Sequence, residues 1–277
     1  MEDKQNYTED ELVLDENIKV EDETSDNTSN TDELALNETS NAEEVTSNSD
    51  NVDVADDHRM GSVVYEDIDF DAIMKKKGVA RFFKRCFDII ASSLGLIFLI
   101  LPFLIIAIAI RCSSKGPVYF RQKRVGKDGK EFRIYKFRTM VVDAESRGKQ
   151  ITVGDDVRIT GIGKFLRKTK LDELPQLINV LIGDMSFVGP RPEVPKYVAM
   201  YNDYERNILR IKPGITELAS ITYRDENEVL AASEDPEDTY INEIMPTKLA
   251  LNMQYMKKMN VFYDIALIFK TFAAILK

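Results

Sequence analysis

The feature that most constrains this chain is an apolar run of 22 residues, Ile89–Ile110, that contains no charged side chain. As an α-helix the run would extend about 33 Å, which is enough to cross the roughly 30 Å hydrocarbon core of a bilayer. A buried helix of a soluble protein is the alternative, but such a helix usually keeps a polar side. The run therefore predicts a membrane-embedded segment.

Basic residues lie on both sides of this run, and Pro102 lies inside it. They are Arg81, Lys84 and Arg85 before the run, and Arg111, Lys115, Arg121, Lys123 and Arg124 after it. Positive charge marks the cytoplasmic side of a membrane segment, and a proline kinks a helix because it removes a backbone hydrogen bond. We therefore expect a re-entrant helix–break–helix kinked at Pro102, with Lys75 and Lys127 both on the cytoplasmic side. A spanning helix remains the alternative.

The segment before this region is strongly acidic. Residues 1–71 contain 24 Asp or Glu and three Lys or Arg, a net charge of −21. Apolar residues do not recur there at helical or strand spacing, so the segment cannot bury enough surface to offset its chain entropy. It also lacks the pattern of a signal peptide. We expect a disordered acidic tail over residues 1–74 that either solubilises the chain or binds a partner. A chain that begins near Ala72 is then expected to keep its activity.

The rest of the chain has the opposite charge and few kinds of reactive side chain. Residues 72–277 hold 34 Lys or Arg against 23 Asp or Glu, a net charge of +11, and the single histidine, His58, lies in the tail. This excludes Ser-His-Asp and Cys-His catalysis and histidine-rich metal sites. Cys86 and Cys112 are too few for a disulfide scaffold or a four-cysteine zinc site, and they indicate reduced thiols facing a cytoplasm.

Local patterns after the apolar run predict further elements. Residues 117–124 and 131–138 alternate like two strands, and the Asp128-Gly129 pair between them is typical of a β-hairpin. A helix is expected over residues 172–181, and two more over residues 246–277.

Together these elements predict a mainly α fold with a small antiparallel β-hairpin (α+β). A basic flank and re-entrant helix would occupy residues 75–112, and a cytoplasmic catalytic domain with amphipathic interfacial helices at its end would occupy residues 113–277. The last helix, Val261–Leu276, suits a membrane surface and a protein core equally.

Two adjacent carboxylates, Asp172 and Glu173, lie at the expected start of the helix over 172–181. Pro175 supports this placement, because proline is best tolerated in the first turn of a helix. One interpretation is simple capping of the helix. The other is a reactive site just beyond the helix end, where both carboxylates can reach the same ligand.

Cations in the surrounding sequence favour the reactive site. They are Lys136, Arg138, Arg158, Lys164, Arg167, Lys168 and Arg191. Arg191 lies between Pro190 and Pro192, which restrict the directions that its guanidinium can take and suit bidentate binding of phosphate. Near a membrane, such a cluster indicates anionic lipid or a phosphate-bearing substrate.

Eight short motifs occur in one order along residues 84–216. They are Lys84-Arg-Cys-Phe-Asp88, Gly116-Pro-Val-Tyr-Phe-Arg-Gln122, Lys136-Phe-Arg-Thr-Met140, Asp156-Val-Arg-Ile-Thr160, Gly163-Lys-Phe-Leu-Arg167, Leu171-Asp-Glu-Leu-Pro-Gln-Leu177, Gly183-Asp-Met-Ser-Phe-Val-Gly-Pro-Arg-Pro192 and Lys212-Pro-Gly-Ile-Thr216. In this order they resemble the bacterial sugar transferase family, the monotopic polyprenyl-phosphate hexose-1-phosphate transferases or phosphoglycosyl transferases. The resemblance covers nearly all of residues 80–277.

The resemblance implies a reaction and a role for each site residue. Asp172 would attack the sugar-linked phosphorus of a UDP-sugar, releasing UMP, and polyprenyl phosphate would then take the phosphosugar from the carboxylate. Glu173 is implied as the ligand of a Mg²⁺ cofactor. Phosphate is implied to be held by Lys136, Arg138, Arg158, Arg167, Arg191 and Arg224. A carboxylate nucleophile agrees with the lack of histidine outside the tail.

The resemblance also implies a location and partners. The protein would lie on the cytoplasmic face of a bacterial inner membrane and start a capsule, exopolysaccharide, O-antigen or protein glycan. Expected partners are a UDP-sugar, undecaprenyl phosphate and membrane lipid, and nucleic acid is not expected. A homo-oligomer and downstream glycosyltransferases are further partners that the resemblance allows.

Two positions depart from the family pattern. Glu217 replaces the glycine that usually follows Pro-Gly-Ile-Thr, and Leu101 replaces a serine that precedes the proline in several relatives. We expect Glu217 to alter the turn or to add a carboxylate near the sugar pocket. From the residues alone, two other functions stay open. One is a non-catalytic membrane adaptor, and the other is a nucleotide-sugar pyrophosphatase that releases UMP without a lipid acceptor.

Overall fold

The apolar run forms two helices that meet at a sharp bend. The computed structural model describes residues 59–60, 63–144, 156–222 and 226–276. Helix α2 (Gly78–Phe98) and helix α3 (Ile100–Ser113) bend by 60° at Leu99. Pro102 lies in the first turn of α3, where its missing N–H is not needed, and its ring would crowd the carbonyl of Phe98 if α2 continued. Pro102 therefore accounts for the bend, although the break lies at Leu99 rather than at the proline itself.

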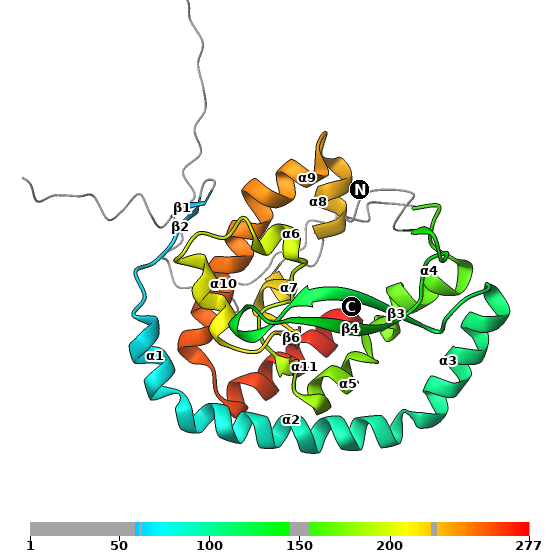
Figure 1. The fold of residues 1–277 in the computed structure, drawn as a ribbon, viewed down its shortest axis with the longest axis horizontal. Coiled ribbons are helices and arrows are strands. Elements are labelled where there is room, and N and C mark those ends of the chain that lie inside the picture. The colour runs from blue at the N-terminus through cyan, green and yellow to red at the C-terminus, as the bar shows by residue number, and fades with distance from the viewer. Residues whose placement is uncertain (1–58, 61–62, 145–155, 223–225, 277) are drawn as a thin grey trace, which may run out of the picture.

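The bent pair has an apolar surface and a polar side. Its exposed large apolar side chains include Phe82, Phe83, Ile90, Leu94, Ile97 and Phe98 on α2, and Ile100, Leu101, Leu104, Ile105 and Ile108 on α3. Lys84 and Asp88 are buried against the strand that contains Ser186 and Val188. Figure 1 shows α1 (Phe70–Lys76), α2 and α3 along one edge of the molecule. In the part of the chain that the structure describes, no single helix is long and apolar enough to span a membrane. Helices α2 and α3 taken as a pair have the required length and apolar composition.

The predicted hairpin is confirmed. Strand β3 (Tyr119–Val125) pairs antiparallel with β4 (Glu131–Phe137), and Asp128 adopts a left-handed φ of 57° in the turn between them. Aspartate tolerates this conformation better than most residues with a side chain. Phe137 packs with Ile110 of α3 and Leu166 of α4 (Gly161–Lys168), so the hairpin is attached to the bent helix pair.

A parallel strand pair was not predicted from the sequence. Strand β5 (Ser186–Val188) pairs with β6 (Gly214–Thr216). The backbone that follows β5 lies very close to the first residue of β6, because a Cβ on Gly214 would lie 2.1 Å from the nitrogen of Gly189. Only glycine fits this approach, which explains why both motifs that contain these strands carry one.

The two helices expected over residues 246–277 are confirmed as α10 (Met245–Lys258) and α11 (Val261–Leu276). Helix α11 has one buried side and one exposed side. Asp264 and Leu267 are buried, whereas Phe262, Phe269 and Phe272 are exposed. The helix is therefore amphipathic, with one side in the protein core.

The expected tail boundary at residue 74 is wrong, because residues 63–74 belong to the folded domain. Val63, Tyr65, Ile68 and Phe70 are each less than 10% exposed and join the main hydrophobic cluster. We call residues 63–71 the N-terminal strap. The prediction of disorder for residues 1–58 and 61–62 lies outside the described residues.

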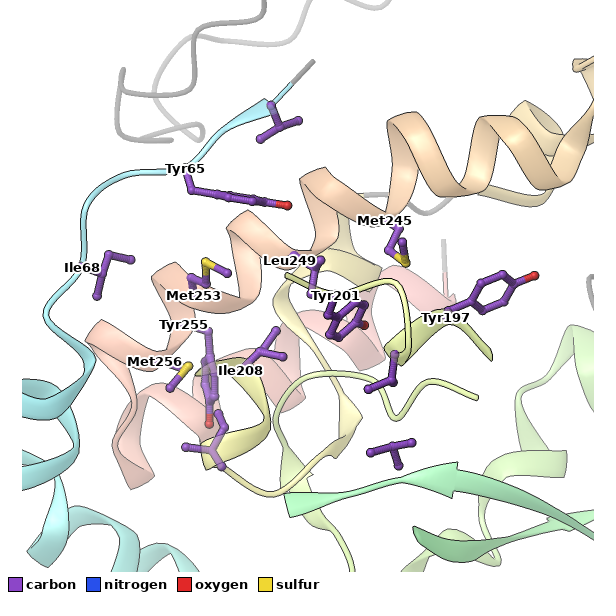
Figure 2. Close-up of a cluster of buried hydrophobic side chains, with 14 of the residues drawn as sticks. Tyr65, Ile68, Tyr197, Tyr201, Ile208, Met245, Leu249, Met253, Tyr255 and Met256 are labelled. Atoms are coloured by element: carbon purple, nitrogen blue, oxygen red, sulfur yellow. The ribbon is translucent and has the colours of Figure 1, made fainter. Parts of the chain in front are cut away.

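The strap packs along α10. Figure 2 shows Tyr65 and Ile68 on the strap beside Met253 and Met256 of α10. The hydroxyl of Tyr65 donates a hydrogen bond of 2.8 Å to Glu205, a fully buried carboxylate. The strap thus contributes both apolar surface and a buried hydrogen bond to the domain.

Short elements connect these parts. They are β1 (Arg59–Met60), β2 (Val63–Val64), η3 (Lys127–Gly129), η5 (Leu171–Glu173), α5 (Gln176–Ile182), α6 (Pro195–Val198), η6 (Glu205–Arg210), α7 (Leu218–Thr222), α8 (Glu226–Ala232), α9 (Pro236–Thr239) and η7 (Tyr240–Ile244). The described chain is therefore mainly helical with a small antiparallel hairpin, as predicted.

Candidate active site

The carboxylate pair, Asp172 and Glu173, lies in η5, a short 3-10 turn between α4 and α5. The helix expected from residue 172 begins only at Gln176, directly after Pro175, because a proline favours the start of a helix over its interior. Lys170 precedes the turn with a left-handed φ of 56°, which is uncommon for a residue with a side chain. The backbone thus turns sharply just before the two carboxylates.

Asn179 holds this region against the hairpin. Its buried side chain, on α5, accepts a hydrogen bond from the N–H of Tyr135 at 2.8 Å and donates one to the carbonyl of Arg133 at 3.0 Å. These bonds fix α5 along β4, which carries Lys136. The turn η5 therefore lies beside that lysine.

Glu173 is bound by two cations. Its Oε1 accepts a hydrogen bond from Nζ of Lys136 and another from the guanidinium of Arg191, each 2.7 Å long. Burial opposes ionisation of Glu173, but the charges of Arg191 and Lys136 outweigh burial and hold the pKa of this carboxyl well below its usual value. Glu173 in turn raises the pKa of the Arg191 guanidinium. Glu173 and Arg191 are therefore charged at neutral pH, whereas burial lowers the pKa of Lys136 against the opposing charge of Glu173.

Asp172 differs from its neighbour. The residue is 8% exposed, and its buried Oδ1 has no hydrogen-bond partner among the described residues. Burial and the adjacent charge of Glu173 raise the pKa of Asp172, against the opposing charges of Lys136 and Arg167. Within the described part of the chain, no side chain caps the start of η5 or α5, and α5 begins only after Pro175, so the simple capping interpretation is wrong. A buried carboxylate oxygen without a partner is costly and is available to a ligand.

Arg167, at the end of α4, lies within electrostatic reach of both carboxylates. Its Nε donates a hydrogen bond of 2.9 Å to the hydroxyl of Thr139. Its charge lowers the pKa of Asp172. The structure thus brings together Lys136, Arg167 and Arg191, three of the cations predicted from the sequence.

Two other predicted phosphate ligands, Arg138 and Arg158, form hydrogen bonds or ion pairs with protein groups outside the carboxylate pair. The guanidinium of Arg138 donates to the carbonyls of Lys115 and Ser114 at 2.6 and 2.8 Å, at the carboxyl end of α3. Arg158 forms an ion pair with Asp156 at 2.6 Å. A helix end leaves carbonyls without intrahelical partners, which explains the use of Arg138 there. The structure does not bring Arg138 into the Glu173 cluster, whereas Arg158 and Asp156 lie within electrostatic reach of Arg167. Arg224 lies outside the described residues.

Two residues near Arg191 were not assigned to the site from the sequence. Arg124 of β3 donates a hydrogen bond of 3.0 Å to the carbonyl of Pro192, in the turn that presents Arg191. Glu217 accepts a hydrogen bond of 2.9 Å from the backbone N–H of Arg191. From the sequence, Glu217 was expected only to alter the turn or to add a carboxylate near the sugar pocket. Its contact with Arg191 was not predicted, because the two residues are far apart in the sequence.

Asp172 and Glu173 would supply only part of the oxygen ligands that a Mg²⁺ ion needs. Among the described residues, no three His, Cys, Asp or Glu side chains are close enough to form a metal cluster. Magnesium, however, is commonly bound by one or two carboxylates, with water and substrate phosphate supplying the other oxygens. Asp172, with its unpartnered buried Oδ1, and the adjacent Glu173 provide such a pair.

Two adjacent carboxylates lie among three partly buried cations, Lys136, Arg167 and Arg191, and this chemistry suits a phosphate-bearing ligand. Residues 79–277 match the family model described as bacterial sugar transferase, and the chain belongs to this family.

Named relatives agree with this membership. A UDP-glucose:undecaprenyl-phosphate glucose-1-phosphate transferase of Klebsiella pneumoniae is 41% identical over 199 residues, 70% of this chain and 40% of the relative. A UDP-N-acetylgalactosamine-undecaprenyl-phosphate N-acetylgalactosaminephosphotransferase of Aeromonas hydrophila is 38% identical over 204 residues, 72% of this chain and 44% of the relative. The chain thus spans less than half the length of these two relatives. It spans 84% of the exopolysaccharide production protein ExoY of Rhizobium meliloti, at 33% identity over 207 residues and 69% of this chain.

Proposed function

We propose that this protein transfers a sugar 1-phosphate from a UDP-sugar to polyprenyl phosphate through a covalent intermediate on Asp172. One observation carries the proposal: Oδ1 of Asp172 is buried without a partner, whereas Glu173 is bound by two cations. The first carboxylate is thus available as a nucleophile, and the second fixes the cations around it. The substrate classes are those in the names of the relatives.

In the first step, a carboxylate oxygen of Asp172 attacks the phosphorus that carries the sugar. A bond from that oxygen to phosphorus forms while the bond from phosphorus to the bridging oxygen breaks, and UMP leaves with the electron pair. Lys136, Arg167 and Arg191 neutralise charge on the diphosphate. Charge neutralisation and positioning are the main contributions that a protein makes to phosphoryl transfer.

In the second step, an oxygen of polyprenyl phosphate attacks the same phosphorus and displaces the carboxylate of Asp172. The product is a lipid-linked sugar diphosphate, and the enzyme returns to its initial state. Both phosphate substrates use the same cations in turn, so one site is sufficient for the two steps.

A Mg²⁺ ion is part of the proposal. When bound, it would neutralise phosphate charge and orient the diphosphate for in-line attack. Glu173 is the residue proposed to hold it, and Asp172 lies next to it. The ion would share the carboxylate of Glu173 with Lys136 and Arg191, whose hydrogen bonds both end on Oε1.

Assays of UMP release test the proposed reaction against its alternatives. Purified protein is given a panel of UDP-sugars, with and without polyprenyl phosphate. Continuous UMP release together with a lipid-linked sugar diphosphate, and at most one UMP per protein when the lipid is omitted, supports the transferase. Continuous release without lipid indicates a pyrophosphatase. Lipid binding without any UMP release indicates a membrane adaptor.

We further propose that α2 and α3 form a re-entrant segment on the cytoplasmic face of a bacterial inner membrane. The exposed apolar side chains of both helices and the 60° bend support this arrangement. The predicted result is that single cysteines at Lys75 and Lys127, introduced after replacement of Cys86 and Cys112 by serine, both resist an impermeant thiol reagent in intact cells. Both should react after the cells are opened. Labelling of only one of them in intact cells would indicate a spanning helix.

The pH profile provides a further prediction. Because burial and Glu173 raise the pKa of Asp172, acid should protonate this nucleophile at a higher pH than the usual value of about 3.9 for aspartate. Only the ionised carboxylate attacks phosphorus, so kcat/KM for the UDP-sugar should fall as the pH decreases through this raised pKa. Initial rates of UMP release across the acidic range measure this limb. A limb at the ordinary aspartate value would contradict the burial of Asp172 in the free enzyme.

A further inference from the structure

We propose that Glu217 is a positioning residue that holds the backbone of Arg191, so that the guanidinium of Arg191 stays at Glu173. This inference rests on the reaction proposed above, because it assigns Arg191 a role in binding substrate phosphate.

The parallel strands β5 and β6 place the two residues side by side. Arg191 follows β5 and Glu217 follows β6, and both strands end at the same edge. Backbone hydrogen bonds connect the residues that follow β5 to β6 itself, from the N–H of Gly189 to the carbonyl of Thr216 at 3.0 Å and from the N–H of Gly214 to the carbonyl of Pro190 at 2.9 Å. A side chain at position 217 is therefore within reach of the turn that carries Arg191.

The carboxylate of Glu217 is fully engaged in this position. Its Oε2 accepts from the backbone N–H of Arg191 at 2.9 Å and from the side-chain amide of Asn252 at 3.1 Å, and its Oε1 accepts from Ser220 at 3.0 Å. Nζ of Lys248 lies 3.8 Å from Oε1. Glu217 is 2% exposed. It therefore connects the Arg191 turn to α10 from the inside, instead of adding a carboxylate for the sugar.

Alternating charges hold Glu217 in its ionised form. Burial opposes ionisation, but Lys248 and Arg191 lower the pKa of Glu217 below its usual value. Lys248 is also bound by Glu226 at 3.1 Å. Negative and positive side chains alternate in the series Glu173, Arg191, Glu217, Lys248 and Glu226. Removal of Glu217 would leave the backbone N–H of Arg191, the amide of Asn252 and the ammonium of Lys248 with fewer partners.

Fixing the backbone of Arg191 matters because its guanidinium acts at a distance from its Cα. A displacement of about 1 Å in a group that positions substrate is enough to cost on the order of 100-fold in rate. Pro190 and Pro192 restrict the local backbone, and the hydrogen bond from Arg191 to Glu217 fixes the turn relative to α10. The proline turn alone does not provide that second attachment.

Two substitutions test the hydrogen bond. Glu217→Ala should lower kcat/KM for the UDP-sugar about 10- to 100-fold. Glu217→Gln retains an oxygen that accepts the Arg191 N–H, and should stay within about fivefold of the natural enzyme. Glu205→Gln is the matched control, because Glu205 is an equally buried carboxylate that binds Tyr65 and Asn202. It should keep full turnover. A loss in Glu217→Gln as large as that in Glu217→Ala would overturn the proposal.

A double-mutant cycle separates positioning from general destabilisation. In an Arg191→Ala background the guanidinium is absent, so Glu217→Ala should add less than a twofold further loss of kcat/KM. Losses that multiply would show that Glu217 acts on the substrate directly or on folding as a whole, and would contradict the assignment.

Hydrogen exchange provides a readout that does not depend on activity. In Glu217→Ala, amide exchange in a peptide covering residues 188–194 should accelerate at least tenfold, and Glu217→Gln should stay near the natural rate. Glu205→Gln should leave that peptide unchanged. Unaltered exchange in Glu217→Ala would overturn the proposal. If the natural protein transfers no phosphosugar at all, the proposed function fails, and the exchange result still decides whether Glu217 holds the Arg191 turn.

Discussion

Replacement of Asp172 by asparagine is expected to lower turnover by about four orders of magnitude or more, on the scale of losing an enzyme's nucleophile. Asparagine keeps the shape of the side chain but lacks the anionic oxygen that attacks phosphorus. Incubation with a UDP-sugar labelled in its sugar should leave label on the natural protein when lipid is omitted, and none on the variant. The measurements are UMP release and mass spectrometry of the trapped adduct.

Two matched variants make this result specific. Asp128→Asn is the same chemical change at an exposed hairpin turn, where asparagine tolerates the left-handed backbone, so turnover should not change. Glu173→Gln should also lower turnover strongly, because Lys136 and Arg191 lose their shared carboxylate. Its dependence on magnesium concentration should also change if Glu173 holds the ion.

Two outcomes would contradict the assignment of Asp172. The first is a phosphosugar adduct on any other residue, and the second is near-normal turnover of Asp172→Asn. Because Oδ1 of Asp172 has no partner within the described residues, the substitution removes no observed hydrogen bond of that atom. A large loss of activity in a folded Asp172→Asn protein therefore reports chemistry rather than damage to the fold.

Elements with local signals were predicted well from the sequence. The Asp128-Gly129 pair specified the hairpin, and the two helices expected over residues 246–277 are confirmed as α10 and α11. Pro102 gave the bend within the apolar run, although sterics place the break at Leu99 because a proline obstructs the turn before it. Each of these features is determined by neighbouring residues.

Features that depend on distant partners were missed. Strands β5 and β6 have three residues each and are separated by a long segment, so no local pattern pairs them. The partner of Arg138 is a helix end, and charge alone does not distinguish an arginine that binds backbone carbonyls from one that binds phosphate. Adjacent carboxylates and a proline-flanked arginine were visible because their motifs are short and contiguous.

The predicted end of the acidic tail was wrong for a related reason. Composition is averaged over a whole segment, so it does not reveal a few apolar residues at one end. The acidic residues of 1–71 conceal a short apolar pattern at its end, and that pattern becomes part of the core only beside α10. Val63, Tyr65, Ile68 and Phe70 supply the buried side chains of the N-terminal strap. The expectation that a chain beginning near Ala72 stays active must therefore be replaced.

A chain that begins at Ala72 is expected to lose stability, whereas one that begins at Asp57 should not. The shorter chain lacks the strap, and the cost should exceed the about 3–5 kcal/mol that removal of one buried aromatic side chain typically causes. The total free energy of unfolding of a domain is only about 5–15 kcal/mol, so the loss endangers the folded state. Denaturant unfolding of both chains in the same detergent measures the difference.

A single substitution separates the polar and apolar contributions of the strap. Tyr65→Phe keeps the ring but removes the hydroxyl that donates to Glu205, so it should cost about 1–3 kcal/mol, less than removal of the whole strap. Lys257→Ala, which breaks the exposed ion pair with Glu66 of the strap, should change stability by less than about 1 kcal/mol. Equal unfolding midpoints for the chains that begin at Asp57 and Ala72 would show that the strap adds nothing to the fold. The folded domain would then begin at residue 72, close to the boundary that the acidic composition suggested.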